Sequence, residues 1–566
     1  MRDSDEQSPA AAKAATPNVV IRATSIAHAH RVLHLGHPDS HVPGYEMPEM
    51  VASAPTGKWL SIGFLLAIVT AVGGFLLEHF SHGVPDARVA LPWVIPFAVL
   101  LAGIATMPFI AKHWWEDNYA RVAIALGGIV AVYYLFFVQF GPGNVARAAA
   151  EYISFIFLLG SLFIVSGGIL IRVRARATPT ANTVILLIGA IIANLFGTTG
   201  ASMLLIRPFI RLNKGHLRAY HIVFFIFVVA NAGGSLTPIG DPPLFLGYLK
   251  GVPFFWVFEN CWPIWLVVNG LLLLIFWIID KLNAARDSRA SYDGDDYGPA
   301  VSFYGATNLL FITLILVGIL GHATLNKVLF HGPWREMLMA LAAFASLATT
   351  PRRVHGENVF NFGPIKEVAF LFVGIFLTMV PALNYLYNNS NKLPLKTPGQ
   401  YYFLSGTLSS VLDNAPTYMT FFQMQLGSLE PATIRREMEI LKDPQHVIDQ
   451  HIAGLDADQI QQVRDTMEAL QKYLPDQYKN GIITDRQLRV LNLVSEPKLN
   501  GFLVAISMGS VLFGAMTYIG NGPNFMVKSI AENTGAPTPS FFGYIFGYSL
   551  PILLPVLIVV WLLFLR

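Results

Sequence analysis

Asp241 lies in a stretch that cannot form a regular transmembrane helix. Residues 231–245 read NAGGSLTPIGDPPLF and separate two strongly apolar runs, 222–230 and 252–279. The prolines remove backbone donors and the glycines favour unwinding. In hydrocarbon, an unwound backbone is tolerated only where protein buries it or where it lines a polar cavity. A broken membrane helix with a carboxylate in the break is typical of a transporter binding site.

A second copy of this pattern occurs near the end of the chain. Residues 514–525 read GAMTYIGNGPNF, and six positions recur at a constant offset of 280, with Asn521 in place of Asp241. These positions are Gly234, Thr237, Ile239, Gly240, Pro243 and Phe245, matched by Gly514, Thr517, Ile519, Gly520, Pro523 and Phe525. Two copies in corresponding apolar segments indicate an internal repeat with the site at its interface.

The second intramembrane acid is Asp413, in the apolar segment 401–427. A carboxylate at this depth costs at least about 2.5–3.5 kcal/mol on insertion scales, so it needs a partner or a role. Sodium takes carboxylate, hydroxyl and carbonyl oxygens, as other hard cations do, and a buried aspartate can exchange a proton when sodium leaves. The alternative is that Asp241 and Asp413 only accept backbone N–H bonds at helix ends.

Polar residues around these two acids predict two pseudo-symmetric half-sites. We expect Asp241, Asp413, Asn414 and Thr237 to bind the sodium ion. Half-site one comprises Asn194, Thr198, Thr199, Ser202, Asn231, Thr237 and Asp241, and half-site two comprises Ser409, Asp413, Asn414, Thr417, Thr517, Asn521 and Asn524.

Composition places the chain in the membrane. Of its 566 residues, 54% are hydrophobic and 13% are charged, and mean hydropathy is +0.51, whereas soluble domains carry about 25% charged residues. The net charge of +3 gives no indication of nucleic-acid binding, and the single cysteine, Cys261, excludes an intramolecular disulfide and a multi-cysteine metal site. No cofactor beyond a coupling ion, Na⁺ or H⁺, is expected. No signal peptide is recognised, so the first span is expected to target the chain.

The apolar runs predict an all-α polytopic membrane protein with about 11 transmembrane helices and two re-entrant hairpins. Segment 181–206 is too short for two spans, yet both its flanks are basic, which a hairpin with its tip at 194–202 explains. Segment 401–427 is expected to form the second hairpin, with its tip at 409–417. Single spans are expected near 58–78, 91–112, 119–139, 151–171, 253–279, 306–322, 335–350, 367–388 and 541–565, with broken spans at 221–249 and 501–532.

After the first span, these elements form two units, each with five spans and a hairpin. Because five is an odd number, the second unit must be inverted in the membrane relative to the first. We expect a polar tail at 1–57, a first span with its linker at 58–90, and repeat 1 at 91–279. A linker at 280–305 precedes repeat 2 at 306–565, which contains a helical extramembranous insert at 430–498. The tail carries five histidines whose spacing fits no standard metal site. Loops rich in Lys and Arg predict a multi-pass protein of the inner (plasma) membrane, with a cytoplasmic N-terminus and an extracytoplasmic C-terminus.

The order of hairpin, broken helix, linker, hairpin and broken helix resembles the ion transporter superfamily. The stretches GGSLTPIGD at 233–241 and DNAP at 413–416 are similar to its NhaD-type sodium/proton antiporter and arsenite branches. The stretches GTTGASMLLIRP at 197–208 and GPIKEVAF at 363–370 resemble a group described as citrate-transporter-like. The dicarboxylate symporters' Ser-Asn-Thr tips are absent, and the first hairpin lacks the acid usual in the antiporters. The resemblance implies a homodimer in lipid with an elevator-type transport domain.

Two functions remain after these observations. The leading hypothesis is a sodium/proton antiporter, because acids at depth suit competition between a cation and a proton. The alternative is a sodium- or proton-coupled symporter of citrate or another carboxylate anion. No zinc motif, Ser-Lys or Ser-His pair, or paired-Asp protease pattern is recognised within the spans, so an enzyme is not expected. Two broken repeats favour alternating access over a passive channel.

Overall fold

The structure is a computed structural model that describes residues 87–173, 176–286, 301–328, 332–392, 395–442 and 454–566, together with residues 73 and 452. The polar tail at 1–57 lies outside the described residues, as does the expected first span at 58–78 apart from residue 73. Residues 287–300 of the expected linker are outside them too. All described residues belong to a unit that starts at Ala54.

Almost every described residue outside the connections is helical, and the expected all-α polytopic membrane fold is confirmed. Within the described ranges, eight helices are long and apolar enough to span a membrane. The helices of the first half are η1 (Leu91–Val94), α4 (Ile95–Ile110), α5 (Lys112–Phe137), α6 (Gly141–Gly167), α7 (Pro179–Leu212), α8 (Ala219–Val228), η2 (Ala232–Gly234), α9 (Pro242–Leu249) and α10 (Trp256–Arg286).

The second half of the chain has more elements than the first. Its helices are α11 (Thr307–Val328), α12 (Trp334–Thr349), α13 (Arg352–Glu357), α14 (Gly363–Asn389), η3 (Ser390–Lys392), α15 (Pro398–Val411), α16 (Asn414–Gly427), α17 (Pro431–Lys442), α19 (Ala457–Tyr473), α20 (Pro475–Asn480), α21 (Asp485–Ser495), α22 (Pro497–Leu512), η4 (Phe513–Met516), α23 (Gly522–Asn533), α24 (Phe541–Tyr544), the π-helix η5 (Ile545–Leu553) and α25 (Leu554–Phe564).

The opening helices of both halves pack together in one group, which we call the bundle (α4, α5, α6, α11, α12 and α14). Helices α5 and α14 approach closely because small residues face each other. A Cβ added at Gly374 would lie only 2.6 Å from the Ala123 carbonyl oxygen. The Phe155 and Phe372 rings of α6 and α14 stack at 4.8 Å. The bundle therefore joins residues from both halves of the chain.

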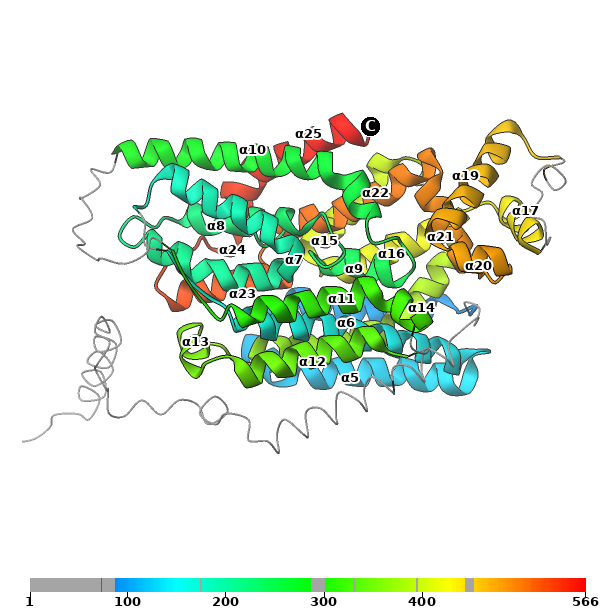
Figure 1. Cartoon of the computed structure of the whole chain (residues 1–566), viewed down its shortest axis with the longest axis horizontal. Coiled ribbons are helices and arrows are strands. Elements are labelled where there is room, and N and C mark those ends of the chain that lie inside the picture. The colour runs from blue at the N-terminus through cyan, green and yellow to red at the C-terminus, as the bar shows by residue number, and fades with distance from the viewer. Residues whose placement is uncertain are drawn as a thin grey trace, which may run out of the picture. The chain divides into compact units, whose positions relative to one another are not determined.

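The remaining membrane elements form a second group, the site assembly (α7–α10, α15, α16 and α22–α25 with η2, η4 and η5). Figure 1 shows α10 and α25 on the side of this group away from α5 and α12, with α7, α9, α15 and α16 between them. Helix α10 supports the first break directly, since Trp265 Nε1 donates to the Gly233 carbonyl over 2.8 Å.

The chain reverses direction within α7. The Asn182 and Asn213 side chains, near its two ends, exchange two hydrogen bonds of 2.9 Å each. The reversal is at Gly197, whose φ of 71° and ψ of 157° are not helical. A side chain would be strained in that conformation, so glycine is required at the turn. The α15–α16 pair also folds back, and its Tyr401 and Phe421 rings lie 6.1 Å apart.

A short antiparallel ladder that the sequence analysis did not predict links the two halves. Strand β1 (Leu170–Val173) pairs with β2 (Val301–Tyr304), and Leu170 lies opposite Tyr304. Strand β1 takes residues that we expected at the end of the span at 151–171, because α6 ends at Gly167. Strand β2 occupies the end of the expected polar linker.

The insert between α16 and α22 is built of amphipathic helices around its own hydrophobic cluster. Helix α19 contributes Val463, Met467 and Leu470 to this cluster, against Leu488 and Leu491 of α21. Figure 1 shows α17, α19, α20 and α21 together at one end of the described unit, next to α22.

Candidate functional site

Four helices begin beside one another at the centre of the site assembly. The second arm of α7 begins at Thr198, α9 at Pro242, α16 at Asn414 and α23 at Gly522. The unpaired N–H groups of a helix start carry partial positive charge. The hydrogen bonds of Asp241 with residues at the other three helix starts bring these positive ends around one carboxylate.

The Asp241 carboxylate is buried, with 1% of its surface exposed, and accepts three side-chain hydrogen bonds. Its Oδ1 accepts from Thr198 Oγ1 at 2.9 Å and from Asn521 Nδ2 at 3.1 Å. Its Oδ2 accepts from Asn414 Nδ2 at 2.6 Å. Burial penalises the charge, and these donors stabilise it. The carboxylate therefore connects the first hairpin, the second hairpin and the second break.

A chain of asparagine amides continues from this carboxylate. Asn521 Nδ2 also donates to Asn231 Oδ1 at 3.1 Å, and Asn231 Nδ2 donates to Asn524 Oδ1 at 2.6 Å. Asn524 Nδ2 then donates to the carbonyls of Gly514 and Thr517. Asn231 belongs to the first break and the other two to the second, so the network ties the breaks to each other.

The two breaks are closed by the same local hydrogen bonds. Thr237 Oγ1 donates to the Asn194 carbonyl at 2.6 Å, and Thr517 Oγ1 donates to the Ser410 carbonyl at 2.5 Å. Each threonine hydroxyl also accepts from the glycine N–H three residues on, at 3.1 Å in both cases. The glycines at 240 and 520 each pack against the backbone of the glycine six residues earlier, where a Cβ would not fit. Positions related by the offset of 280 thus have the same local geometry.

Asp413 and Asn414 stand at the turn of the second hairpin. Asp413 Oδ1 accepts from the Ala415 N–H at 3.0 Å, so this aspartate caps α16. The Asp413 and Asp241 carboxylates are also close enough to repel each other. Within the part of the chain that the structure describes, the Asn414 side-chain oxygen is buried without a hydrogen-bond donor. Carboxylate and amide oxygens are ligands of the type that hard cations bind.

The other residues expected in the half-sites have mixed positions. Asn194 bonds to the Gly233 carbonyl and the Leu236 N–H, so it fixes the backbone of the first break. Ser409 donates to the Ser510 carbonyl, and Thr417 donates to the Asp413 carbonyl within its own helix. Ser202 is buried, whereas Thr199 is partly exposed and is not among the three donors to Asp241.

The sequence analysis missed a second polar region, to which the insert contributes a side chain. Lys250, just after α9, forms an ion pair with Glu151 of α6. Arg147 of α6 and Arg486 of α21 line the same cavity. The signal was weak, because Glu151 begins one expected apolar run, Lys250 borders another, and Arg486 lies in the insert. Only the packing of these elements brings the charges together.

Comparison with known proteins gives one family. A family model described as "Putative citrate transport" matches residues 86–565, which include every described residue from 87 to 565. No curated protein matches the chain.

Proposed function

The chain belongs to this citrate transport family, and from its membership and the geometry around Asp241 we propose that it is a cation-coupled secondary transporter in which sodium exchanges for protons. The observation that carries the proposal is the buried Asp241 carboxylate, which donors from both halves of the chain hold and which Asp413 repels. The Asn414 side-chain oxygen, without a donor among the described residues, belongs to the same helix start as one of these donors. Carboxylate and amide oxygens are ligands of the kind that hard cations prefer.

Exchange follows from competition at these carboxylates. A sodium ion between Asp241 and Asp413 would relieve their repulsion, and a proton on either one would do the same. Sodium and protons therefore bind in turn rather than together. The Thr198, Asn414 and Asn521 donors hold the Asp241 carboxylate in place while the occupant changes.

We further propose that the site assembly moves against the bundle in an elevator-type cycle. The grouping of helices supports this, because the opening helices of both halves form the bundle while both hairpins and both breaks lie in the site assembly. We place the scaffold role, lipid contact and the homodimer interface on the bundle. Its helix α5 exposes large apolar side chains such as Val132, Phe136 and Phe137.

Symport of citrate or another carboxylate with sodium or protons is the second candidate. The family description favours it, as do the four helix starts around Asp241, because positive helix ends and amide N–H groups suit an anionic substrate. The two aspartates oppose it unless a bound cation first neutralises them.

One experiment separates the candidates. The purified protein is placed in liposomes that contain a pH-sensitive dye, and sodium is added outside, first alone and then with labelled citrate. A proton flux driven by sodium alone, absent in Asp413→Asn, supports exchange. Citrate uptake that requires a sodium or proton gradient, with no proton flux on sodium alone, would replace exchange by symport. An absence of both fluxes from liposomes that contain folded, fully incorporated protein would contradict cation-coupled transport of these solutes.

A further inference from the structure

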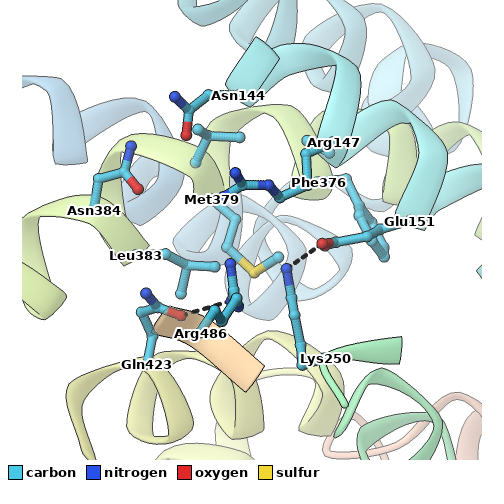
Figure 2. A pocket seen from close by; sticks show the side chains of 12 residues that line it. Asn144, Arg147, Glu151, Lys250, Phe376, Met379, Leu383, Asn384, Gln423 and Arg486 are labelled. Atoms are coloured by element: carbon cyan, nitrogen blue, oxygen red, sulfur yellow. Dashed lines mark hydrogen bonds and ion pairs between the residues drawn. The ribbon is translucent and has the colours of Figure 1, made fainter. Parts of the chain in front are cut away.

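A cationic cavity lies where the bundle, the site assembly and the insert meet. Its walls come from α6 and α14 of the bundle, from Lys250 and Gln423 of the site assembly, and from Arg486 on α21 of the insert. Figure 2 shows the Arg147, Lys250 and Arg486 side chains directed into this cavity from different elements. It is separate from the asparagine network around Asp241, none of whose residues lines it.

Cationic side chains outnumber carboxylates among the described residues that line the cavity. Arg147, Lys250 and Arg486 contribute three cations, and Glu151 is the one carboxylate among the described residues that line it. The Glu151 carboxylate is bound to the Lys250 ammonium, whose side chain is 6% exposed. The two arginines also lie near enough to repel the Lys250 ammonium. Like charges repel more strongly in such a partly buried place than in water, so a negative charge bound among them would be stabilised.

Arg486 has an unused donor at this place. Its Nη2 donates to Gln423 Oε1 at 3.0 Å, as the dashed line in Figure 2 marks. Among the residues that the structure describes, its Nε–H is buried and has no acceptor. A buried guanidinium N–H without an acceptor costs free energy that an anion would recover.

From this geometry we propose that the cavity is a binding site for one small anion, held by Arg147, Lys250 and Arg486. The free space is about 30 Å³, which is room for a group the size of a water molecule. The occupant is therefore either a free inorganic anion such as chloride or the carboxylate end of a larger solute. Both have the same chemistry, a compact negative charge that accepts from guanidinium and ammonium donors.

Anion binding here would fasten three parts of the protein together. Arg147 belongs to the bundle, Arg486 to the insert, and Lys250 follows α9, the helix that begins next to Asp241. The anion would thus hold the end of the first broken helix against both neighbours. We infer that it stabilises the described arrangement of these three parts, whatever solute Asp241 serves.

The test is a melting experiment on the full-length purified protein at constant sodium concentration and ionic strength, with a bulky sulfonate as the balancing anion. Chloride and citrate are titrated separately and then together. We expect a saturable rise in melting temperature whose apparent affinity falls at least tenfold in Arg486→Gln. The matched control is Arg436→Gln, which removes the same charge from the exposed Arg436–Glu439 pair of α17 and should leave the affinity unchanged.

The outcomes distinguish the two anion sources. Stabilisation by chloride without competition from citrate identifies a free inorganic anion, whereas citrate that stabilises and displaces chloride identifies a carboxylate end. If neither anion stabilises the protein, or if Arg486→Gln binds them as wild type does, the site does not exist. Should Arg486→Gln fail to fold, Arg147→Gln tests the same cavity from the bundle side. An affinity lost in Asp241→Asn would move the anion to the Asp241 site and overturn the proposal.

Discussion

Asn414 Nδ2 donates to Asp241 Oδ2 over 2.6 Å, joining the tip of the second hairpin to the first broken helix, 173 residues away in the chain. The contact connects the two halves at the buried carboxylate itself. At this contact the first break supplies the acid and the second hairpin supplies the amide donor. Changes on either side should therefore affect this carboxylate.

Asp241→Asn should abolish coupled transport while leaving the protein folded. The new amide would direct N–H groups at the Thr198, Asn414 or Asn521 donors and would remove the negative charge. Because the proposed sodium ion would lose a negatively charged oxygen ligand, we expect sodium to bind much more weakly. The measurement is sodium-driven proton flux in liposomes, with size-exclusion elution as the folding control. Wild-type flux in this variant would remove Asp241 from the site.

Asp413 has a capping role that can be separated from a role in transport. Asparagine caps helices about as well as aspartate, whereas alanine costs about 1 kcal/mol. We expect Asp413→Asn to melt like wild type and Asp413→Ala to melt at a lower temperature, because the bond to the Ala415 N–H is lost only in the second. Both should lack coupled flux. If Asp413→Asn transports normally, the carboxylate serves only to cap α16.

The pair Asp241 and Asn521 allows a test of the pseudo-symmetry. Asn521 Nδ2 now donates to Asp241 Oδ1 at 3.1 Å, so Asn521→Asp would place a second carboxylate next to the first. Two carboxylates this close cannot both ionise without large repulsion. We expect this variant to melt at a lower temperature at pH 8 than at pH 5, relative to wild type. Exchanging the residues in Asp241→Asn/Asn521→Asp leaves one carboxylate and should restore most of the stability. If the double variant is no more stable than Asn521→Asp alone, positions 241 and 521 are not equivalent sites for the carboxylate.

Local patterns were sufficient to predict the membrane fold and the breaks. Apolar runs of spanning length, and glycines and prolines that interrupt them, act on the chain near their own positions. The turn at Gly197 falls within the expected tip at 194–202 for the same reason. The site set from the sequence stays a prediction in functional terms, although the structure brings Thr198, Asp241, Asn414 and Asn521 together.

Contacts between distant segments could not be predicted in this way. Glu151 and Lys250 are single charges near the ends of apolar runs, and nothing near either one indicates a partner 99 residues away. Strands β1 and β2 pair with each other although helices α7 to α10 separate them along the chain. The bond from Asn231 to Asn524 interlocks half-sites that the sequence describes separately. Such partners are set by packing, which no local pattern reports.

Gly197→Ala should disturb the first hairpin. The residue has a φ of 71°, and an added Cβ would lie 3.3 Å from the Ile239 carbonyl oxygen. Backbone strain of this kind costs about 1–3 kcal/mol. We expect a lower melting temperature and weaker sodium-driven flux, since Thr198 follows directly. The control is Gly160→Ala in α6, where a Cβ meets no other atom within 4 Å and where alanine should stabilise the helix.

Glu437 should make the insert less stable as pH rises. It is buried on α17, its Oε2 accepts from Asn492 Nδ2 at 2.7 Å, and burial raises the pKa of its carboxyl to about 8 from an ordinary value of 4.5. Between these values the folded carboxyl keeps its proton while the unfolded one ionises. The stabilisation is therefore complete below about pH 4.5 and is lost as pH rises through about 8.

The corresponding measurement is protease resistance of the insert between pH 5 and pH 9 in the full-length protein. Wild type should become easier to cut within 431–495 as pH rises, and Glu437→Gln should remove most of this dependence because the amide stays neutral. Glu439→Gln on the same helix is the matched control, since its carboxylate is exposed and pairs with Arg436. Equal pH dependence in Glu437→Gln and wild type would show that another group destabilises the insert at high pH.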